Sequence, residues 1–205
     1  MSRHFLQDKI AHMPICNSLV ENYEQIKKEV VAFCKDPMSL VDYPNYPVPE
    51  YKSIYENYWK AAPFCTFRDE YIELNGNPEF RKYLKELTDN TRSKCPTLVK
   101  CISDMESKEY LANGFISRLL PGTVINPHFG WSNNWLRCHL GIVCDPGCKI
   151  TVGGESKTWE EGKLLAFYDG GNYPHSLRHE GTQERIIVSV DLNIRYIREN
   201  YNEEI

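Results

Sequence analysis

The chain has 205 residues, of which 41% are hydrophobic, and a formal net charge of -4. This length and composition suit a single domain with its own core. The acidic balance excludes a long basic surface for nucleic acid. No apolar run reaches the ~18–20 residues that span a bilayer, and the first residues lack the apolar segment of a secretory signal. We therefore expect a cytoplasmic protein without a membrane segment, present as a monomer or weak dimer.

Cysteine is frequent, but the chain is long enough to fold without disulfides. No Cys-x-x-Cys pair occurs, which argues against a zinc ribbon. We expect reduced and mostly buried thiols. Cys144 and Cys148 flank an Asp-Pro-Gly turn and could face each other across a hairpin, so this pair is the one to test for oxidation.

The first part of the chain is expected to flank the core. Residues 1–17 are predicted to be irregular, with His4 and His12 in solvent. Apolar residues recur at spacings of three and four from residue 19 to 34, which predicts a helix. Residues 37–63 are rich in proline and tyrosine and should form an extended arm, which could wrap the core or line a substrate groove.

Two further helices are predicted, one opening at Pro78 and a shorter one following Cys95-Pro96-Thr97. After about Asn113 the pattern changes to short strands separated by glycine and proline turns, which is typical of a sandwich or barrel. The expected strands are 115–120, 136–144, 149–152, 156–159, 164–168 and 185–192.

These elements predict a mainly β protein with flanking α-helices. We expect one domain, 1–205. Residues 1–112 would form the helical and tyrosine- and proline-rich flanking region, and residues 113–193 the β core. A short helix is expected from residue 194 to 201.

Strand alternation predicts which polar side chains point inward. Arg137 and His139 share one face of their strand, and Arg185 and Ser189 share one face of the last strand. In a single barrel, Arg137, His139 and Arg185 can all point inside. Buried arginines without a counter-charge cost several kcal/mol, so the pattern predicts an anion or internal acidic partners. The alternative is a pair of surface arginines on an edge strand.

Two histidines lie in turn-rich runs between strands: His128 follows Pro127, and His175 follows Pro174. Imidazole is a ligand for iron, zinc and copper. Together with inward arginines, the two histidines indicate a metal site, although loop histidines are often only solvated. His179 lies between charged neighbours and is predicted to be exposed.

Several short motifs follow one another in this half of the chain. They are Pro121-Gly-Thr, Pro127-His128-x-Gly130, Leu136-Arg137-x-His139-Leu140, Trp159-x-x-Gly162-Lys163-x-x-x-Phe167, His175 and Arg185. Taken in order over about residues 93–193, they resemble the aspartyl/asparaginyl β-hydroxylase family. The resemblance implies an iron(II)- and 2-oxoglutarate-dependent oxygenase on a double-stranded β-helix, a jelly-roll or cupin-like core.

The resemblance implies that His128 and His175 hold Fe(II). Many related oxygenases add a carboxylate ligand two residues after the first histidine. That residue here is Gly130, and in this family water takes the place of the carboxylate. The vacancy would also admit a halide, which leaves halogenation as a minor alternative.

The resemblance also assigns the residues that bind the cosubstrate 2-oxoglutarate. Arg185 would pair with its distal carboxylate, helped by the hydroxyl of Ser117. Arg137 and His139 would hold the end nearest the metal. A guanidinium suits this role because its fork of donors matches a planar carboxylate.

The implied reaction is hydroxylation of the β-carbon of aspartyl or asparaginyl residues in a peptide or protein. Two other substrate classes remain open within the family: small amino acids such as proline, and lipid acyl chains. A non-catalytic metal- or anion-binding module is the alternative outside the enzymes. A structural protein that makes contacts through the tyrosine-rich arm is another.

Overall fold

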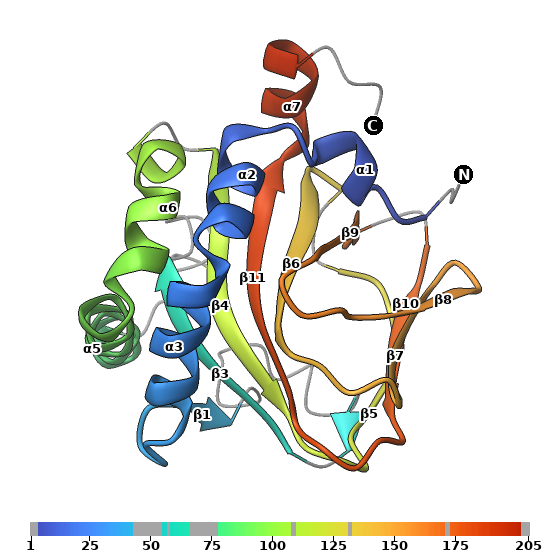
Figure 1. Ribbon diagram of the computed structural model, residues 1–205, viewed down its shortest axis with the longest axis horizontal. Helices are drawn as coiled ribbons and strands as arrows, with labels where there is room; N and C mark the ends of the chain where they lie inside the picture. The colour runs from blue at the N-terminus through green and yellow to red at the C-terminus, as the bar shows by residue number, and fades with distance from the viewer. Residues whose placement is uncertain are drawn as a thin grey trace.

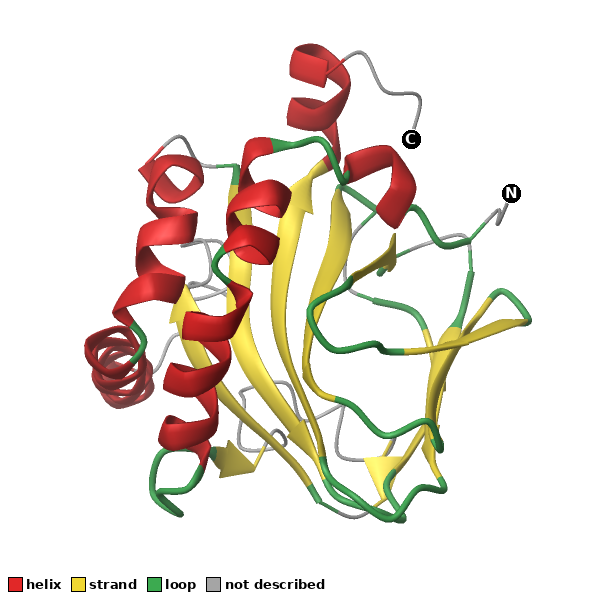
Figure 2. Cartoon of the chain, viewed as in Figure 1, coloured by secondary structure: helices red, strands yellow, loops and turns green. Residues whose placement is uncertain are grey.

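The computed structural model describes residues 4–42, 55–56, 58–65, 78–107, 110–130, 133–170 and 173–201. Two antiparallel sheets lie opposite each other, and a layer of helices covers the outer face of the larger sheet (Figure 1). Coloured by secondary structure, the helices lie mainly on one side of the molecule and the strands on the other (Figure 2). The predicted mainly β architecture with flanking helices and a double-stranded β-helix core is confirmed.

The larger sheet has six strands in the order β1-β3-β4-β11-β6-β9. Their bounds are β1 Val41–Asp42, β3 Trp59–Cys65, β4 Leu111–Leu119, β11 Arg185–Asn193, β6 Trp135–Val143 and β9 Leu164–Tyr168. The smaller sheet has five strands in the order β2-β5-β10-β7-β8. Their bounds are β2 Tyr55–Glu56, β5 Val124–His128, β10 His175–His179, β7 Cys148–Val152 and β8 Glu155–Thr158.

The helices are α1 Gln7–Ile10, α2 Pro14–Glu21, α3 Tyr23–Cys34, α5 Pro78–Lys94, α6 Pro96–Ser107 and α7 Ile194–Tyr201. The predicted helix 19–34 is in fact two helices that meet at Asn22. Residues 1–17, which we expected to be irregular, contain α1 and the start of α2. Pro14 explains where α2 begins, because proline suits the first turn of a helix. The helix predicted at Pro78 and the one at the C-terminal end are confirmed, and the helix predicted to follow Thr97 begins slightly earlier, at Pro96.

Strand β11 shows how the core is divided. Ile186, Val188 and Val190 are buried on its outer side among side chains of the helices, whereas Ile187 belongs to a smaller apolar cluster inside the barrel. The alternation follows from the two-residue period of a strand. The inner face therefore keeps room for Arg185 and the other polar residues of the interior.

Five strands were not predicted. The proline-rich arm contains the short strands β1 and β2 and also β3, which pairs with β4, and a register shift between Pro63 and Cys65 accommodates the proline. The region before residue 113 therefore contributes strands as well as helices, while residues 43–54 of the arm lie outside the described residues. The segments predicted as loops at His128 and His175 are strands β5 and β10, whose proline and polar residues hide the usual apolar pattern.

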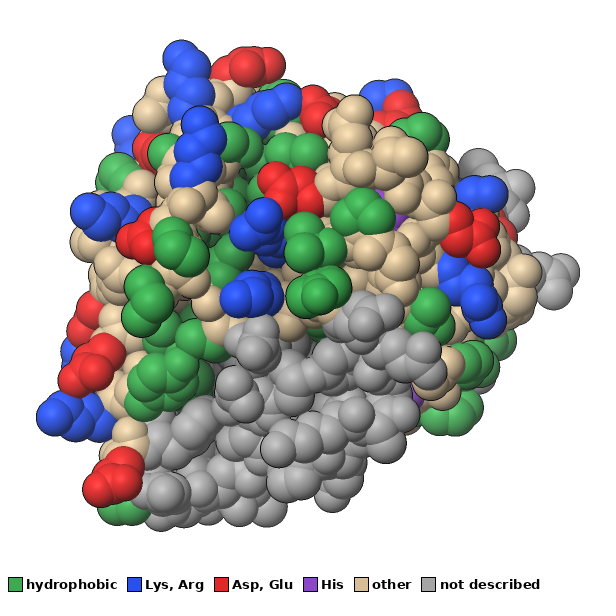
Figure 3. All heavy atoms as spheres, turned by 90° about the horizontal axis from the view of Figure 1, so that it is seen from below, with side chains coloured by type: hydrophobic (Ala, Val, Ile, Leu, Met, Phe, Trp, Pro, Cys, Tyr) green, Lys and Arg blue, Asp and Glu red, His purple; other side chains and the backbone are tan. Residues whose placement is uncertain are grey.

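All eight cysteines are free thiols, and Cys101 and Cys144 are the two that are partly exposed. Among the described residues, no helix combines the length and the apolar character needed to cross a membrane. Seen from below, the described part of the surface carries acidic and basic side chains interspersed with one another (Figure 3).

Candidate functional site

The smaller sheet brings the two predicted metal-ligating histidines together. His128 ends β5, His175 begins β10, and the two residues are direct partners in the antiparallel pairing of these strands. Their ring centroids are 4.1 Å apart. Neighbouring strands, rather than neighbouring loops, thus place two imidazoles where they can share one ion.

The protonation of the histidines suits a metal. Burial lowers the pKa of His128 and lowers that of His175 well below its usual value. Nδ1 of His128 lies 2.8 Å from the carbonyl oxygen of Asn126, so this nitrogen carries the proton and Nε2 carries the lone pair. A backbone carbonyl that fixes the tautomer in this way is a common support for a metal-ligating histidine.

Gly130 lies against the backbone of the loop that precedes the second histidine. Its amide donates to the carbonyl oxygen of Asp169 at 2.6 Å. A Cβ added to Gly130 would lie 2.3 Å from that oxygen and 2.2 Å from a carboxylate oxygen of the same residue. A carboxylate at position 130 would therefore need the backbone to move. Across the described residues, no group of three or more His, Cys, Asp or Glu side chains could hold a metal ion.

Arg137 reaches the interior and finds internal acidic partners there. Its guanidinium forms ion pairs with Asp191 at 2.8 Å and with Asp169 at 2.5 Å, and the latter carboxylate lies 3.5 Å from Nε2 of His175. The sequence left open whether an inward arginine meets an anion or a protein carboxylate, and for Arg137 the structure shows carboxylates. One guanidinium between two carboxylates leaves negative charge beside the histidines.

Sequence reasoning did not assign these two carboxylates a role. Asp191 could have been found, because it lies on the same strand face as Arg185 and Ser189. Its direct strand partner is Arg137. Asp169 follows the end of β9 in a loop, and no periodic pattern marks it.

Arg185 contrasts with Arg137. Its side chain is buried, and its Nε and Nη1 atoms have no hydrogen-bond partner among the described residues. Its Nη2 lies 3.4 Å from the hydroxyl of Ser117, and the guanidinium stacks over the ring of Trp159 at 4.8 Å. Burial lowers the pKa of Arg185, yet guanidinium groups stay protonated in proteins. This arrangement fits a bound anion, because the charge otherwise lacks a counter-ion.

His139 lies between the two ends of the site. Its Nδ1 accepts a hydrogen bond from the indole N–H of Trp159 at 3.1 Å, so a neutral ring carries its proton on Nε2. Burial, together with the charges of Arg137 and Arg185, holds the pKa of His139 well below its usual value. The ring is therefore a neutral donor in the barrel interior.

One predicted exposure is wrong. His179 is 1% exposed, because it stands on the inward side of β10 instead of in a loop. The charged residues on either side misled the prediction, since in a strand they point to the opposite face.

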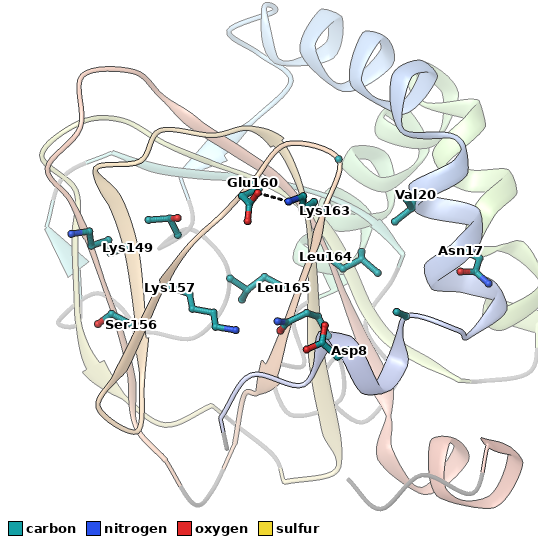
Figure 4. Close-up of a pocket in the computed structure, with 14 residues that line it drawn as sticks. Asp8, Asn17, Val20, Lys149, Ser156, Lys157, Glu160, Lys163, Leu164 and Leu165 are labelled. Atoms are coloured by element: carbon teal, nitrogen blue, oxygen red, sulfur yellow. Dashed lines mark hydrogen bonds and ion pairs between the residues drawn. The ribbon is translucent and has the colours of Figure 1, made fainter. Parts of the chain in front are cut away.

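A separate hollow of about 850 Å³ lies where the edge strands β8 and β9 approach α1 and α2. Lys149, Lys157 and Lys163 line it together with Asp8 and Glu160 (Figure 4). None of the predicted site residues lines this hollow, so it is distinct from the histidine pair.

The fold and the site together define a class. The chain is a double-stranded β-helix protein that carries two facing histidines on one sheet and, on the other, the buried Arg185 and the partly buried Arg137. A sequence model described as aspartyl/asparaginyl β-hydroxylase matches residues 20–194. The chain belongs to this family.

Two human relatives illustrate the match. Aspartate beta-hydroxylase domain-containing protein 2 is 34% identical over 151 residues, which are 67% of this chain and 40% of the relative. Aspartyl/asparaginyl beta-hydroxylase is 45% identical over 73 residues, or 35% of this chain and 9% of the relative. The chain thus spans less than half the length of these relatives.

Among solved structures, a prolyl-4-hydroxylase from Pseudomonas putida aligns with 83% of this chain and 86% of its own, at a TM-score of 0.46 and 16% identity. A cupin domain of a transcriptional regulator from Enterobacter cloacae aligns with 42% of this chain and 84% of its own, at a TM-score of 0.36 and 15% identity.

Proposed function

We propose that the protein is an iron(II)- and 2-oxoglutarate-dependent hydroxylase that acts on the β-carbon of aspartyl or asparaginyl residues in a peptide or protein. The observation that carries this proposal is the buried guanidinium of Arg185, which has donors without acceptors in the described part of the barrel. Family membership and the facing histidines support the same function.

The donor set fits the metal. Two neutral imidazoles are ligands that suit iron, and the carboxylates around Arg137 add negative charge nearby. His128 and His175 would hold the ion. Asp169 would orient the side chains of Arg137 and His175, since its carboxylate contacts both.

The rest of the interior fits a 2-oxo acid with a second carboxylate. Arg185 and Ser117 would hold the distal carboxylate, while His139 would donate from Nε2 to the end near the metal. Arg137, which is paired with Asp169 and Asp191, would add positive charge near that end of the cosubstrate. When bound, iron and 2-oxoglutarate supply, with O₂, the oxidation that converts C–H to C–OH and yields succinate and CO₂. The protein binds, orients and excludes water.

Two exposed aromatic side chains lie next to the histidines in sequence. Phe129 follows His128 and is 55% exposed, and Tyr173 precedes His175 by two residues and is 39% exposed. Single exposed apolar side chains are common on protein surfaces, so it is the position of these two rings beside the histidines that links them to the substrate. We expect both to contact the peptide around the hydroxylated residue.

The test combines binding and turnover. Iron(II) and 2-oxoglutarate are added without oxygen, and a weak visible charge-transfer band is expected. Air should then yield succinate, and a peptide containing Asp or Asn should gain one oxygen by mass spectrometry. His128→Ala should abolish the band and the succinate, whereas His12→Ala, at an exposed histidine, should preserve both. A folded wild-type protein that gives neither band nor succinate would refute the proposal.

A further inference from the structure

His179 is the last residue of β10, and its side chain lies on the same inward face as that of His175 at the other end of the strand. His175, Leu177 and His179 are buried, while Ser176 and Arg178 between them are more exposed. Three residues lie between the two histidines, and the four steps along the strand span roughly 13 Å. The imidazole of His179 therefore belongs to the barrel interior, but away from the metal-binding pair.

Several contacts connect His179 with the anion-binding end of the site. His179 pairs across the sheet with Cys148 of β7, and the thiol of Cys148 lies beside the guanidinium of Arg185. Burial lowers the pKa of His179, Asp145 and a backbone contact with Gln183 raise it, and the charge of Arg185 lowers it further. The imidazole and the guanidinium thus come from opposite sheets and both lie near Cys148.

Both groups have unpartnered donors there. Nδ1 of His179 accepts the amide N–H of Gly181 at 3.3 Å, so a neutral ring carries its proton on Nε2. Within the described residues, Nε2 has no hydrogen-bond partner, and the same is true of Nε and Nη1 of Arg185. Buried donors are normally satisfied, so donors left over on two sheets indicate a ligand that only accepts. A carboxylate has this property.

We propose that His179 is a second donor to the carboxylate bound by Arg185, so that the distal end of 2-oxoglutarate is held from both sheets. The inference rests on the proposed function and adds a residue to it. It makes His179 a determinant of specificity, because a 2-oxo acid without the distal carboxylate gains nothing from this contact.

The experiment measures binding by calorimetry to the full chain loaded with Mn(II), which avoids turnover. The ligands are 2-oxoglutarate and 2-oxobutyrate, which lacks the distal carboxylate. His179→Leu should weaken 2-oxoglutarate about tenfold or more, as expected for a lost hydrogen bond to a charged group. It should change 2-oxobutyrate less than about twofold. His179→Gln, which keeps a donor, should recover most of the affinity, and His12→Gln should bind like wild type.

The outcomes separate the two proposals. Failure of the wild type to bind 2-oxoglutarate overturns the proposed function and this inference together. Normal wild-type binding with an unchanged affinity in His179→Leu overturns the inference alone. An equal loss for both ligands also overturns it, because it assigns His179 a purely structural role. Thermal unfolding of each variant shows whether the fold is retained, and His179→Gln provides the comparison if the leucine variant is unstable.

Discussion

The outer and inner faces of the six-stranded sheet come from the same strands but carry different residues. On β4, Ile116 is buried among the side chains that pack under the helices, while Phe115 and Ser117 on either side face the interior. The outer face is apolar and provides most of the described core. The inner face accepts buried charge. Stability and binding therefore depend on opposite sides of one sheet, so substitutions on the two sides should have separable effects.

The largest effect on stability is expected from the outer face. Ile116→Ala should lower the free energy of unfolding by about 2–5 kcal/mol, because it removes a fully buried side chain and leaves a cavity. Urea denaturation measures this change. Affinity for 2-oxoglutarate should stay within about twofold of wild type. Val20→Ala, at a half-exposed position on α2, is the control and should change stability by less than ~0.5 kcal/mol.

The opposite result is expected on the inner face. Arg185→Met should weaken 2-oxoglutarate binding by about 30- to 1,000-fold, or 2–4 kcal/mol, because the distal carboxylate loses its charged partner. Stability should hold or rise, since an unpartnered buried charge is removed. Calorimetry and urea denaturation measure the two quantities. The matched control is Arg178→Met on the exposed side of β10, and a large loss of stability in Arg185→Met would contradict the division of faces.

Gly130 tests how closely the loop before His175 is packed. Gly130→Ala should cost about 1–3 kcal/mol of unfolding free energy, because its Cβ would lie 2.3 Å from a backbone oxygen of Asp169. Gly130→Asp should not create a stronger metal site, since its side chain would start from the same crowded position. Tighter Mn(II) binding by the aspartate variant would show that this backbone yields easily.

The smallest expected effect is the response to pH. His139 has a pKa well below its usual value through burial and neighbouring positive charge, so the unfolded chain binds protons more readily than the native protein does. Stability should be full above the ordinary histidine pKa of about 6.5 and fall as pH decreases below it. One such group contributes at most about 1.4 kcal/mol per pH unit. His139→Gln should flatten the dependence of unfolding free energy on pH between pH 7 and 5. An unchanged slope would show that other groups cause this dependence.

The sequence was informative where a local period carried the signal. Strand alternation predicted that Arg185 and His139 point inward, and both are buried. It failed for β5 and β10, whose short runs contain Pro127 or several polar residues. The exposure of His179 was wrong for the same reason, because a strand that is not recognised cannot assign its faces.

The local chemistry alone specified the helix start at Pro78, a helix close to Pro96, the facing of residues within the recognised strands, and the set of motifs typical of the family. Long-range pairing specified the rest. The register of β10 against β5 makes His175 the partner of His128, and the approach of Asp169 and Asp191 neutralises Arg137 while Arg185 keeps unpartnered donors. These contacts join residues 32 to 54 positions apart, where no local period extends, so only the packed sheets could fix them.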